Sequence, residues 1–205
     1  SQAFIDFRGI QDDFMRKHSS DYFINSRKAT YANRAYCIQN PKNFKGYSEN
    51  IWGLTACDGP GHKRLTINDL EYQFDGYSAR GASAKYVNDD GTIAPTAAGG
   101  SLPFAPEICE PALQTMWTNY YDQLVGEYGF KDAFNLTFSP KGDDTSGWFD
   151  PDYIGIDQGV LLLQLENHRT ELIWTILKKN KYLQDGLKKA GFLPTKNKNK
   201  LDHEE

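Results

Sequence analysis

The sequence predicts an all-α fold, about half of an α/α barrel. Apolar residues recur at helical spacing in several segments. The connections between these segments are long and rich in glycine and aromatic residues, and long ordered loops in compact domains usually carry function. We count about six helices, half of what a barrel of six helical hairpins requires. We therefore expect the other half of such a barrel to lie outside this sequence.

Length and charge narrow the possible partners. A chain of 205 residues is long enough for one domain with a core. Its net charge of -4 argues against a nucleic-acid partner, because no basic face is available to neutralise phosphates. The sequence has no run of about twenty apolar residues, so we expect no membrane span.

The first third of the chain predicts two helices. A short helix is expected around Asp12 to Lys17. The run Ser19-Ser20-Asp21 then offers an N-cap for a helix running to about Gln39, where Asn40-Pro41 ends it. Four apolar residues fall on one face of this helix at the spacing of core residues: Ile24, Tyr31, Ala35 and Ile38.

The middle of the chain mixes loops with shorter elements. Residues 49–56 fit a helical and an extended structure equally. Alternating polar and apolar residues in 62–75 predict a hairpin or strand, and residues 89–91 predict a turn. Small residues in 94–100 fit a short, closely packed helix. A long helix is expected over 106–124, because proline is well placed in a first helical turn.

The segment 148–169 has two halves with different properties. The first half is a loop of Gly, Pro, Asp and aromatic residues, a composition typical of binding surfaces. The second half, from Gln158, is the most apolar run of the chain and predicts a helix that is buried on all sides. Asp157 lies at the junction. It either caps the helix N-terminus or is a carboxylate held ionised at the floor of a pocket.

The end of the chain predicts two closing helices, over 170–179 and 181–190. Gly191 follows as a stop signal.

Aromatic residues and carboxylates together point to a sugar ligand. Aromatics make up 14% of the chain, and flat apolar faces beside polar groups suit a sugar or another planar ligand. Glycoside hydrolysis needs two carboxyl groups, one as acid and one as base or nucleophile. Glu49 lies between aromatic residues that would raise its pKa, as a catalytic acid needs. The alternative, which residue type favours, is that Glu49 pairs with an arginine or accepts a hydrogen bond from a backbone N–H. Carboxylates next to aromatics or glycines are Glu49, Asp58, Asp75, Asp132, Asp150, Asp152 and Asp157.

The basic residues, cysteines and histidines suggest no cofactor. The guanidinium groups of Arg8 and Arg80 are each expected to donate two hydrogen bonds. The acceptor is either a carboxylate, in a structural ion pair, or the hydroxyls of a sugar. The three cysteines and four histidines show no metal-ligand spacing, and no nucleotide-binding motif is present. We therefore expect neither a metal nor a cofactor.

Several segments, which follow one another over nearly the whole chain, closely resemble the bacterial glucoamylase-like family. That family includes endo-β-1,2-glucanases and glucoamylase-like proteins of Bacteroidetes. The matching segments are IDFRGIQDDFMRK, DYFINSRKATYANRAYCIQNP, GYSENIWGLTACDGPG, DDGTIAPTAAGGSLPFAPE, EYGFKDAFN and WFDPDYIGIDQGVLLLQLENHRT.

The resemblance implies that residues 1–205 are the C-terminal half of a single (α/α)6-barrel (toroid) domain. It implies a glycoside hydrolase acting on β-1,2-glucan or a related gluco-oligosaccharide, with inversion, in a cleft at one end of the barrel. The implied partners are this substrate and the N-terminal half of the same domain. The implied location is the periplasm or surface of a bacterium, or the medium. The alternative is a carbohydrate-binding protein on the same scaffold that has lost hydrolysis.

The resemblance also suggests roles for individual residues. Asp157 is expected to be an ionised catalytic carboxylate, and Glu49 the second acid. Trp52 and Tyr128 are expected to stack on sugars. Arg80 and Gln158 are expected to donate hydrogen bonds to hydroxyls. The other positions expected to line the cleft are Arg8, Asp58, Tyr77, Phe130 and Asp150.

Overall fold

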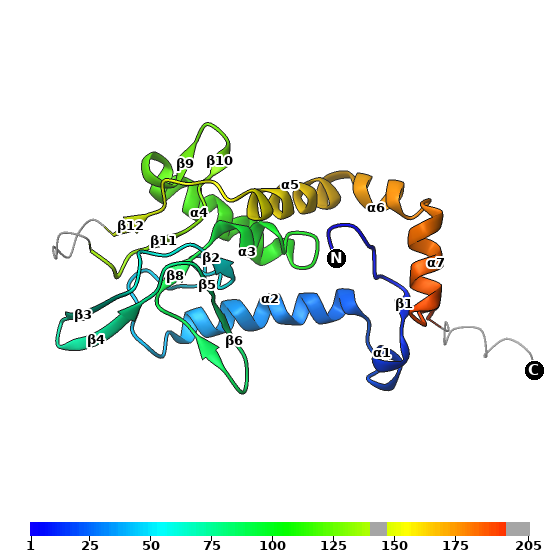
Figure 1. Cartoon of the computed structure of the whole chain (residues 1–205), viewed down its shortest axis with the longest axis horizontal. Coiled ribbons are helices and arrows are strands. Elements are labelled where there is room, and N and C mark those ends of the chain that lie inside the picture. The colour runs from blue at the N-terminus through cyan, green and yellow to red at the C-terminus, as the bar shows by residue number, and fades with distance from the viewer. Residues whose placement is uncertain (140–146, 196–205) are drawn as a thin grey trace, which may run out of the picture.

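The computed structural model describes residues 1–139 and 147–195, which form seven helices and a set of short strands. Figure 1 shows most of the strands gathered at one end of an elongated molecule, and α5, α6 and α7 leading to the other end, where β1 lies. The helices are α1 (Asp13–Lys17), α2 (Tyr22–Gln39), α3 (Pro95–Gly99), α4 (Pro106–Leu124), α5 (Gly155–Thr170), α6 (Leu172–Leu177) and α7 (Lys181–Lys189).

Six small antiparallel sheets connect the helices in the described residues. A three-stranded sheet has the order β12-β11-β8, and each of the other sheets is a pair of strands. The prediction of an all-α chain is therefore confirmed only in part: the chain is built on helices, but the loops between them pair with one another over two to five residues. The strands are β1 (Ile10–Gln11), β2 (Ala56–Cys57), β3 (Lys63–Ile67), β4 (Leu70–Phe74), β5 (Ser78–Ala79), β6 (Gly81–Ala82), β7 (Val87–Asn88), β8 (Thr92–Ile93), β9 (Val125–Gly126), β10 (Gly129–Phe130), β11 (Phe134–Asn135), β12 (Trp148–Phe149) and β13 (Leu193–Pro194).

Most of the predicted helices are confirmed, together with the signals that end them. Asp21 caps α2 by accepting a hydrogen bond from the backbone N–H of Ile24, and Asn40 ends the helix in the left-handed conformation. Pro106 begins α4. Gly191 follows α7 with a φ of 81°. The β3–β4 hairpin is also confirmed, and its tight turn places Asn68 and Asp69 at positive φ.

Two predicted core faces are wrong. The apolar face of α2 is exposed, and the buried residues of that helix are Thr30 and Cys37. Helix α5 is not buried on all sides: Leu162 is 65% exposed, whereas the polar Gln164 and Asn167 are buried. A stripe of apolar residues identifies a face that can be buried, but it does not show what covers that face.

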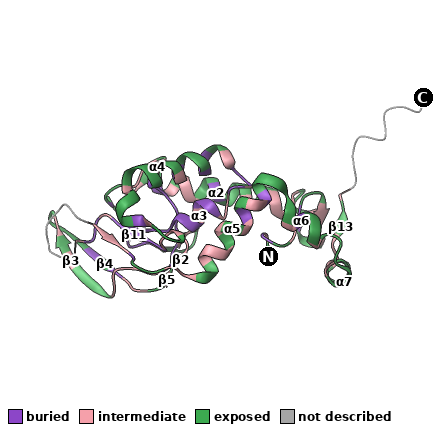
Figure 2. Cartoon of the chain, turned by 90° about the horizontal axis from the view of Figure 1, so that it is seen from above, coloured by how far each residue is buried: buried purple, intermediate pink, exposed green. Residues whose placement is uncertain are grey.

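The main core lies at the strand-rich end, around α3 and α4. Figure 2 shows α3 buried and α7 mostly exposed. Large buried side chains of this core are Trp52, Ile93, Met116, Leu124 and Phe134. The 49–56 segment is neither helix nor a long strand. It is an irregular loop that carries Trp52 into the core and ends in β2. In the described part of the chain, no helix has the length and apolar character needed to cross a membrane.

Candidate functional site

Three loops meet beside the three-stranded sheet, and each of them brings an aspartate. Asp58 follows β2, Asp132 precedes β11 and Asp150 follows β12. The antiparallel pairing of β11 with β12 aligns the last two, because the Asp150 N–H donates to the carbonyl of Ala133 (2.9 Å). The backbone N–H of Asp58 donates to Oδ2 of Asp132 at 2.8 Å. We call Asp58, Asp132, Asp150 and the adjacent Asp157 the acidic cluster.

In two of these carboxylates, one oxygen accepts a hydrogen bond from a backbone N–H and the other oxygen has no hydrogen-bond partner in the described residues. Asp132 is 1% exposed and Asp150 is 3% exposed. Oδ1 of Asp150 accepts a hydrogen bond from the Asp152 N–H at 3.1 Å, as Oδ2 of Asp132 does from Asp58. Their remaining oxygens, Oδ1 of Asp132 and Oδ2 of Asp150, are buried and have no hydrogen-bond partner in the described part of the chain.

Asp157 joins the cluster from the first turn of α5. Its predicted role as N-cap is wrong, because the capping position is Ile154, whose carbonyl accepts a hydrogen bond from the Asp157 N–H. The Asp157 carbonyl accepts a hydrogen bond from the Thr96 hydroxyl of α3 at 2.9 Å, which ties the start of α5 to the core. Its Oδ2 is a further buried oxygen without a partner.

Burial and mutual repulsion raise the pKa values in the cluster. Burial raises the pKa of Asp132 to about 6, and the neighbouring Asp157 and Asp58 add to the rise. The pKa of Asp150 is likewise raised to about 6, first by burial and then by Asp58 and Asp132. Burial also raises the pKa of Asp157. The expectation that the helix N-terminus keeps Asp157 ionised is therefore opposed by the loss of solvent around it.

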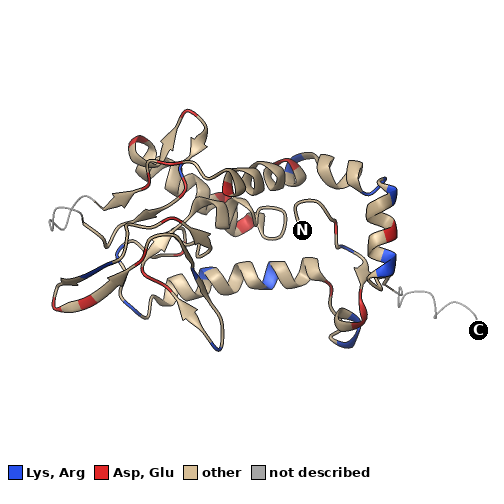
Figure 3. Ribbon diagram, in the orientation of Figure 1, with Lys and Arg blue, Asp and Glu red and all other residues tan. Residues whose placement is uncertain are grey.

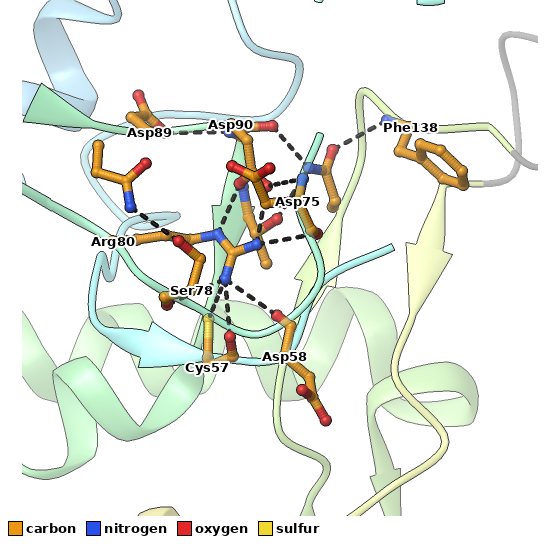
Figure 4. A network of polar contacts seen from close by, with 12 residues as sticks. Cys57, Asp58, Asp75, Ser78, Arg80, Asp89, Asp90 and Phe138 are labelled. Atoms are coloured by element: carbon orange, nitrogen blue, oxygen red, sulfur yellow. Dashed lines mark hydrogen bonds and ion pairs between the residues drawn. The ribbon is translucent and has the colours of Figure 1, made fainter. Parts of the chain in front are cut away.

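A second buried network surrounds Arg80 and adjoins the acidic cluster (Figure 4). Arg80, 4% exposed, donates from Nε and Nη2 to the two carboxylate oxygens of Asp90 at 2.7 and 2.8 Å. Its Nη1 donates to the carbonyl of Cys57 at 2.8 Å. Burial acts to raise the pKa of Asp90, but the hydrogen bonds and the positive charge of Arg80, together with hydrogen bonds from Asp75 and Thr92, outweigh it and lower that pKa. Arg80 thus forms a structural ion pair with Asp90, and its predicted role as a donor to sugar hydroxyls is wrong in this structure.

An apolar groove lies along α5. It has a volume of about 370 Å³. Tyr128, which is 69% exposed, contacts Tyr153 edge to face with ring centroids 5.4 Å apart. Gln158 donates its amide N–H to the carbonyl of Phe130 at 2.6 Å, so part of its donor capacity is already used. The groove is lined by Leu102, Leu113, Trp117, Tyr128, Gly129, Phe130, Gln158, Leu161, Leu162 and Leu165.

The other predicted site residues lie apart from the cluster or are inaccessible. Trp52 is 1% exposed in the core, so it offers no face to a sugar. Glu49 is exposed and lies 3.6 Å from Arg34 of α2, the ion pair that was its alternative interpretation. Tyr77 is exposed on the loop before β5.

Arg8 lies at the far end of α5 from the acidic cluster. It pairs with Asp6 and with Glu171, each at 2.8 Å, and stacks over Trp174. Glu171 follows the C-terminus of α5, so at 1.5 Å per helical residue it lies about 21 Å from Asp157 along the helix axis.

Asp132 is the residue that sequence reasoning passed over. It is one of the carboxylates beside aromatic residues, but nothing in its local spacing sets it apart from the others. Only the pairing of short strands brings it next to Asp58 and Asp150. The one local signal in the sequence is that apolar residues, Ala133 and Phe134, follow Asp132. The structure shows that both are buried.

Comparison with known proteins places the whole arrangement in one family. Residues 1–181 match the family described as "Putative glucoamylase". An exo-β-1,2-glucooligosaccharide sophorohydrolase (non-reducing end) of Parabacteroides distasonis is 34% identical over 170 residues, which is 83% of this chain and 20% of that protein.

Two solved structures are similar over almost all of the described fold. A protein described as a putative glucoamylase from Bacteroides uniformis is 41% identical, with a TM-score of 0.75 over 95% of this chain and 40% of its own. An endo-β-1,2-glucanase from Chitinophaga pinensis, in complex with sophorotriose and glucose, is 33% identical, with a TM-score of 0.73 over 93% of this chain and 39% of its own. The chain thus spans about two fifths of these structures and a fifth of the curated relative. On these matches, the chain belongs to the glucoamylase-like family.

Proposed function

We propose that the protein is a glycoside hydrolase acting on β-1,2-glucan or a related gluco-oligosaccharide. The observation that carries the proposal is the similarity, over more than nine tenths of this chain, to an endo-β-1,2-glucanase whose structure contains sophorotriose and glucose. The sophorohydrolase relative acts on the same linkage according to its name. The groove beside α5 supports the proposal with exposed aromatic rings next to amide groups, a surface suited to a sugar chain.

Within this chain, Asp157 is the carboxyl group that we propose to act on the glycosidic bond. It belongs to the acidic cluster, lies in the first turn of α5, and is followed in the sequence by the groove residue Gln158. Hydrolysis with inversion requires a second carboxyl group far enough away to leave room for a water molecule. Glu49 remains our proposal for that group; its side chain is exposed, and it would contact a ligand by leaving its ion pair with Arg34.

We further propose that residues 1–205 form the C-terminal half of an (α/α)6-barrel domain. The exposed apolar faces of α2 and α5 support this proposal, because contiguous exposed apolar surface usually marks an interface. The shared 40% of the related structures agrees with it. The N-terminal half of the domain would cover the apolar face of α2 and the α5 residues outside the groove, Ile156 and Val160, and would complete the cleft. We also propose that the protein acts in the periplasm or outside the cell, which fractionation would test.

Hydrolysis by the full-length protein with the substitution Asp157→Asn tests the proposed function. Release of reducing sugar from β-1,2-glucan should fall by about 100-fold or more, the usual range for a lost acid or base, while glucan binding is kept. Asp152→Asn is the matched control, because Asp152 is exposed on the same loop. A fully active, normally folded Asp157→Asn protein would exclude the catalytic role. Glucan binding by the wild type without any release of sugar would instead support a non-hydrolytic carbohydrate-binding protein.

A further inference from the structure

The acidic cluster has no counter-charge in the described part of the chain. None of its four carboxylates forms an ion pair with Lys, Arg or His there, whereas the neighbouring Asp90 has Arg80. Figure 4 shows the Asp58 side chain directed away from Arg80, which contacts only the backbone carbonyl of Asp58, at 3.4 Å. Figure 3 shows further acidic residues on the loops of this end of the molecule. Burying carboxylates without a cation costs free energy of folding, and a bound cation would offset that cost.

The geometry of three of these carboxylates fits one metal ion. One oxygen from each of Asp58, Asp132 and Asp150 lies within 4.8 Å of the others. Calcium binds oxygens at about 2.4 Å, so two ligands on opposite sides of the ion are about 4.8 Å apart. A single ion can therefore reach all three carboxylates with little movement.

Two of the three carboxylates each keep a buried oxygen that a cation could bind. In Asp132 and Asp150, a backbone N–H holds one carboxylate oxygen and leaves the other buried without a partner. Backbone donors of this kind fix the orientation of a ligand before the metal arrives, as groups around metal ligands commonly do. These two unpartnered oxygens distinguish the cluster from an ordinary group of surface acids.

We propose that Asp58, Asp132 and Asp150 bind one divalent cation, and that this cation is calcium. All three ligands are carboxylate oxygens with no His or Cys among them, a set that suits hard cations rather than zinc or copper. Calcium tolerates irregular loop geometry and fills its remaining positions with water or carbonyl oxygens. The ion connects the loop after β2 to the loop before β11 and the loop after β12, and it thereby fixes the positions of these three loops relative to one another. This proposal does not depend on the proposed function.

Thermal unfolding of the full-length protein, first stripped with EDTA, tests the site. Calcium chloride in the millimolar range should raise Tm by about 5 °C or more, because a ligand that binds only the folded state stabilises it. Asp132→Asn and Asp150→Asn should each lose most of this shift. Asp152→Asn, which alters an exposed aspartate on the same loop, should keep it. No shift in the wild type, or a full shift in both Asp132→Asn and Asp150→Asn, would overturn the proposal.

Terbium luminescence gives a second measurement that needs no substitution among the ligands. Trp148 lies two residues before Asp150 and packs against the buried cluster of Cys57, Ala94 and Ala133, which contains the neighbours in sequence of Asp58 and Asp132, so its indole should sensitise a bound Tb³⁺ ion. We expect sensitised emission that calcium displaces. Trp148→Phe should abolish most of the emission while the calcium-induced Tm shift remains. Emission that is absent in the wild type, or that calcium does not displace, would contradict a calcium site at this place.

Discussion

Two buried carboxylates, Asp90 and Asp132, show what a counter-charge does to an acid inside this protein. Both are almost fully buried, and they lie in adjoining networks connected through Asp58. The pKa of Asp90 is lowered, because the hydrogen bonds and charge of Arg80, together with hydrogen bonds from Asp75 and Thr92, outweigh the effect of burial. The pKa of Asp132 is raised to about 6, because burial acts there without any cation and among other carboxylates.

The comparison separates a structural network from a functional one. The Arg80 network is complete: the guanidinium makes a bidentate pair with Asp90 and donates to surrounding carbonyls. The acidic cluster keeps buried oxygens without partners in three of its members. A protein that maintains such an arrangement retains it at a cost in stability, and such sites are commonly functional.

The largest expected effect comes from breaking the complete network. Asp90→Asn removes the charge that neutralises Arg80 and leaves a buried guanidinium unpaired. Removal of one partner from a buried ion pair typically costs about 3–5 kcal/mol. Urea unfolding of the variant should show a loss in this range. A loss below about 1 kcal/mol would mean that Arg80 is held mainly by the surrounding carbonyls.

A smaller loss is expected when Arg80 is displaced without changing any charge. A Cβ at Gly59 would lie 2.2 Å from Nη2 of Arg80 and 2.3 Å from the carbonyl of Asp75. Gly59→Ala should therefore destabilise the protein by about 1–3 kcal/mol, the usual range for overpacking. Gly155→Ala is the matched control, because a Cβ there meets no atom within 4 Å. Equal unfolding free energies for the two variants would show that the Arg80 network tolerates displacement.

A substitution in the acidic cluster should leave the free energy of unfolding unchanged or raise it, whereas the two substitutions above lower it. In EDTA at neutral pH, Asp132→Asn removes one of several crowded charges, and the amide oxygen can still accept the hydrogen bond from Asp58. The variant should be as stable as the wild type or more stable by about 1 kcal/mol, because an unpaired buried charge is removed. A loss comparable to that of Asp90→Asn would contradict the distinction between the two networks.

The smallest change in the free energy of unfolding is expected for an exposed carboxylate, Glu107, which serves as a reference for the buried carboxylates of both networks. Hydrogen bonds from Tyr31 and Arg27 lower the pKa of Glu107 to about 2. Because this folded-state pKa lies below the unfolded value, the stabilisation is present above about pH 4.5 and is lost as the pH falls toward 2. Its size should be about 0.5 kcal/mol, since the pair is solvent-exposed. Unfolding between pH 2 and 6 should show this contribution in the wild type and not in Glu107→Gln. Equal slopes would mean that the pair contributes nothing.

Helices were predictable from sequence because their signals are local. The Asp21 cap, the Asn40-Pro41 end and the apolar period are sufficient to place α2 within the chain. The strands of two residues carry no periodic pattern, so the small sheets could not be predicted. The exposed apolar face of α2 was assigned to the core, because periodicity does not reveal whether another element covers a face.

The site was only partly predictable, for a related reason. Asp58, Asp150 and Asp157 were named from their aromatic and glycine-rich surroundings, and the structure brings them together. Trp52 and Arg80 have the residue types of a sugar site but are buried in the core and in an ion pair. Burial and pairing depend on contacts between loops that are distant in the sequence, so residue type alone could not separate the two cases.

The most direct test of the difference between the two networks is a crystal structure of the full-length protein grown with calcium. Anomalous diffraction at a long wavelength would locate the ion. We predict a calcium peak with oxygens of Asp58, Asp132 and Asp150 at about 2.3–2.6 Å, and none beside Arg80 and Asp90. A well-ordered cluster without such a peak, with its carboxyl groups hydrogen-bonded to one another, would contradict the account and show that protons neutralise these acids.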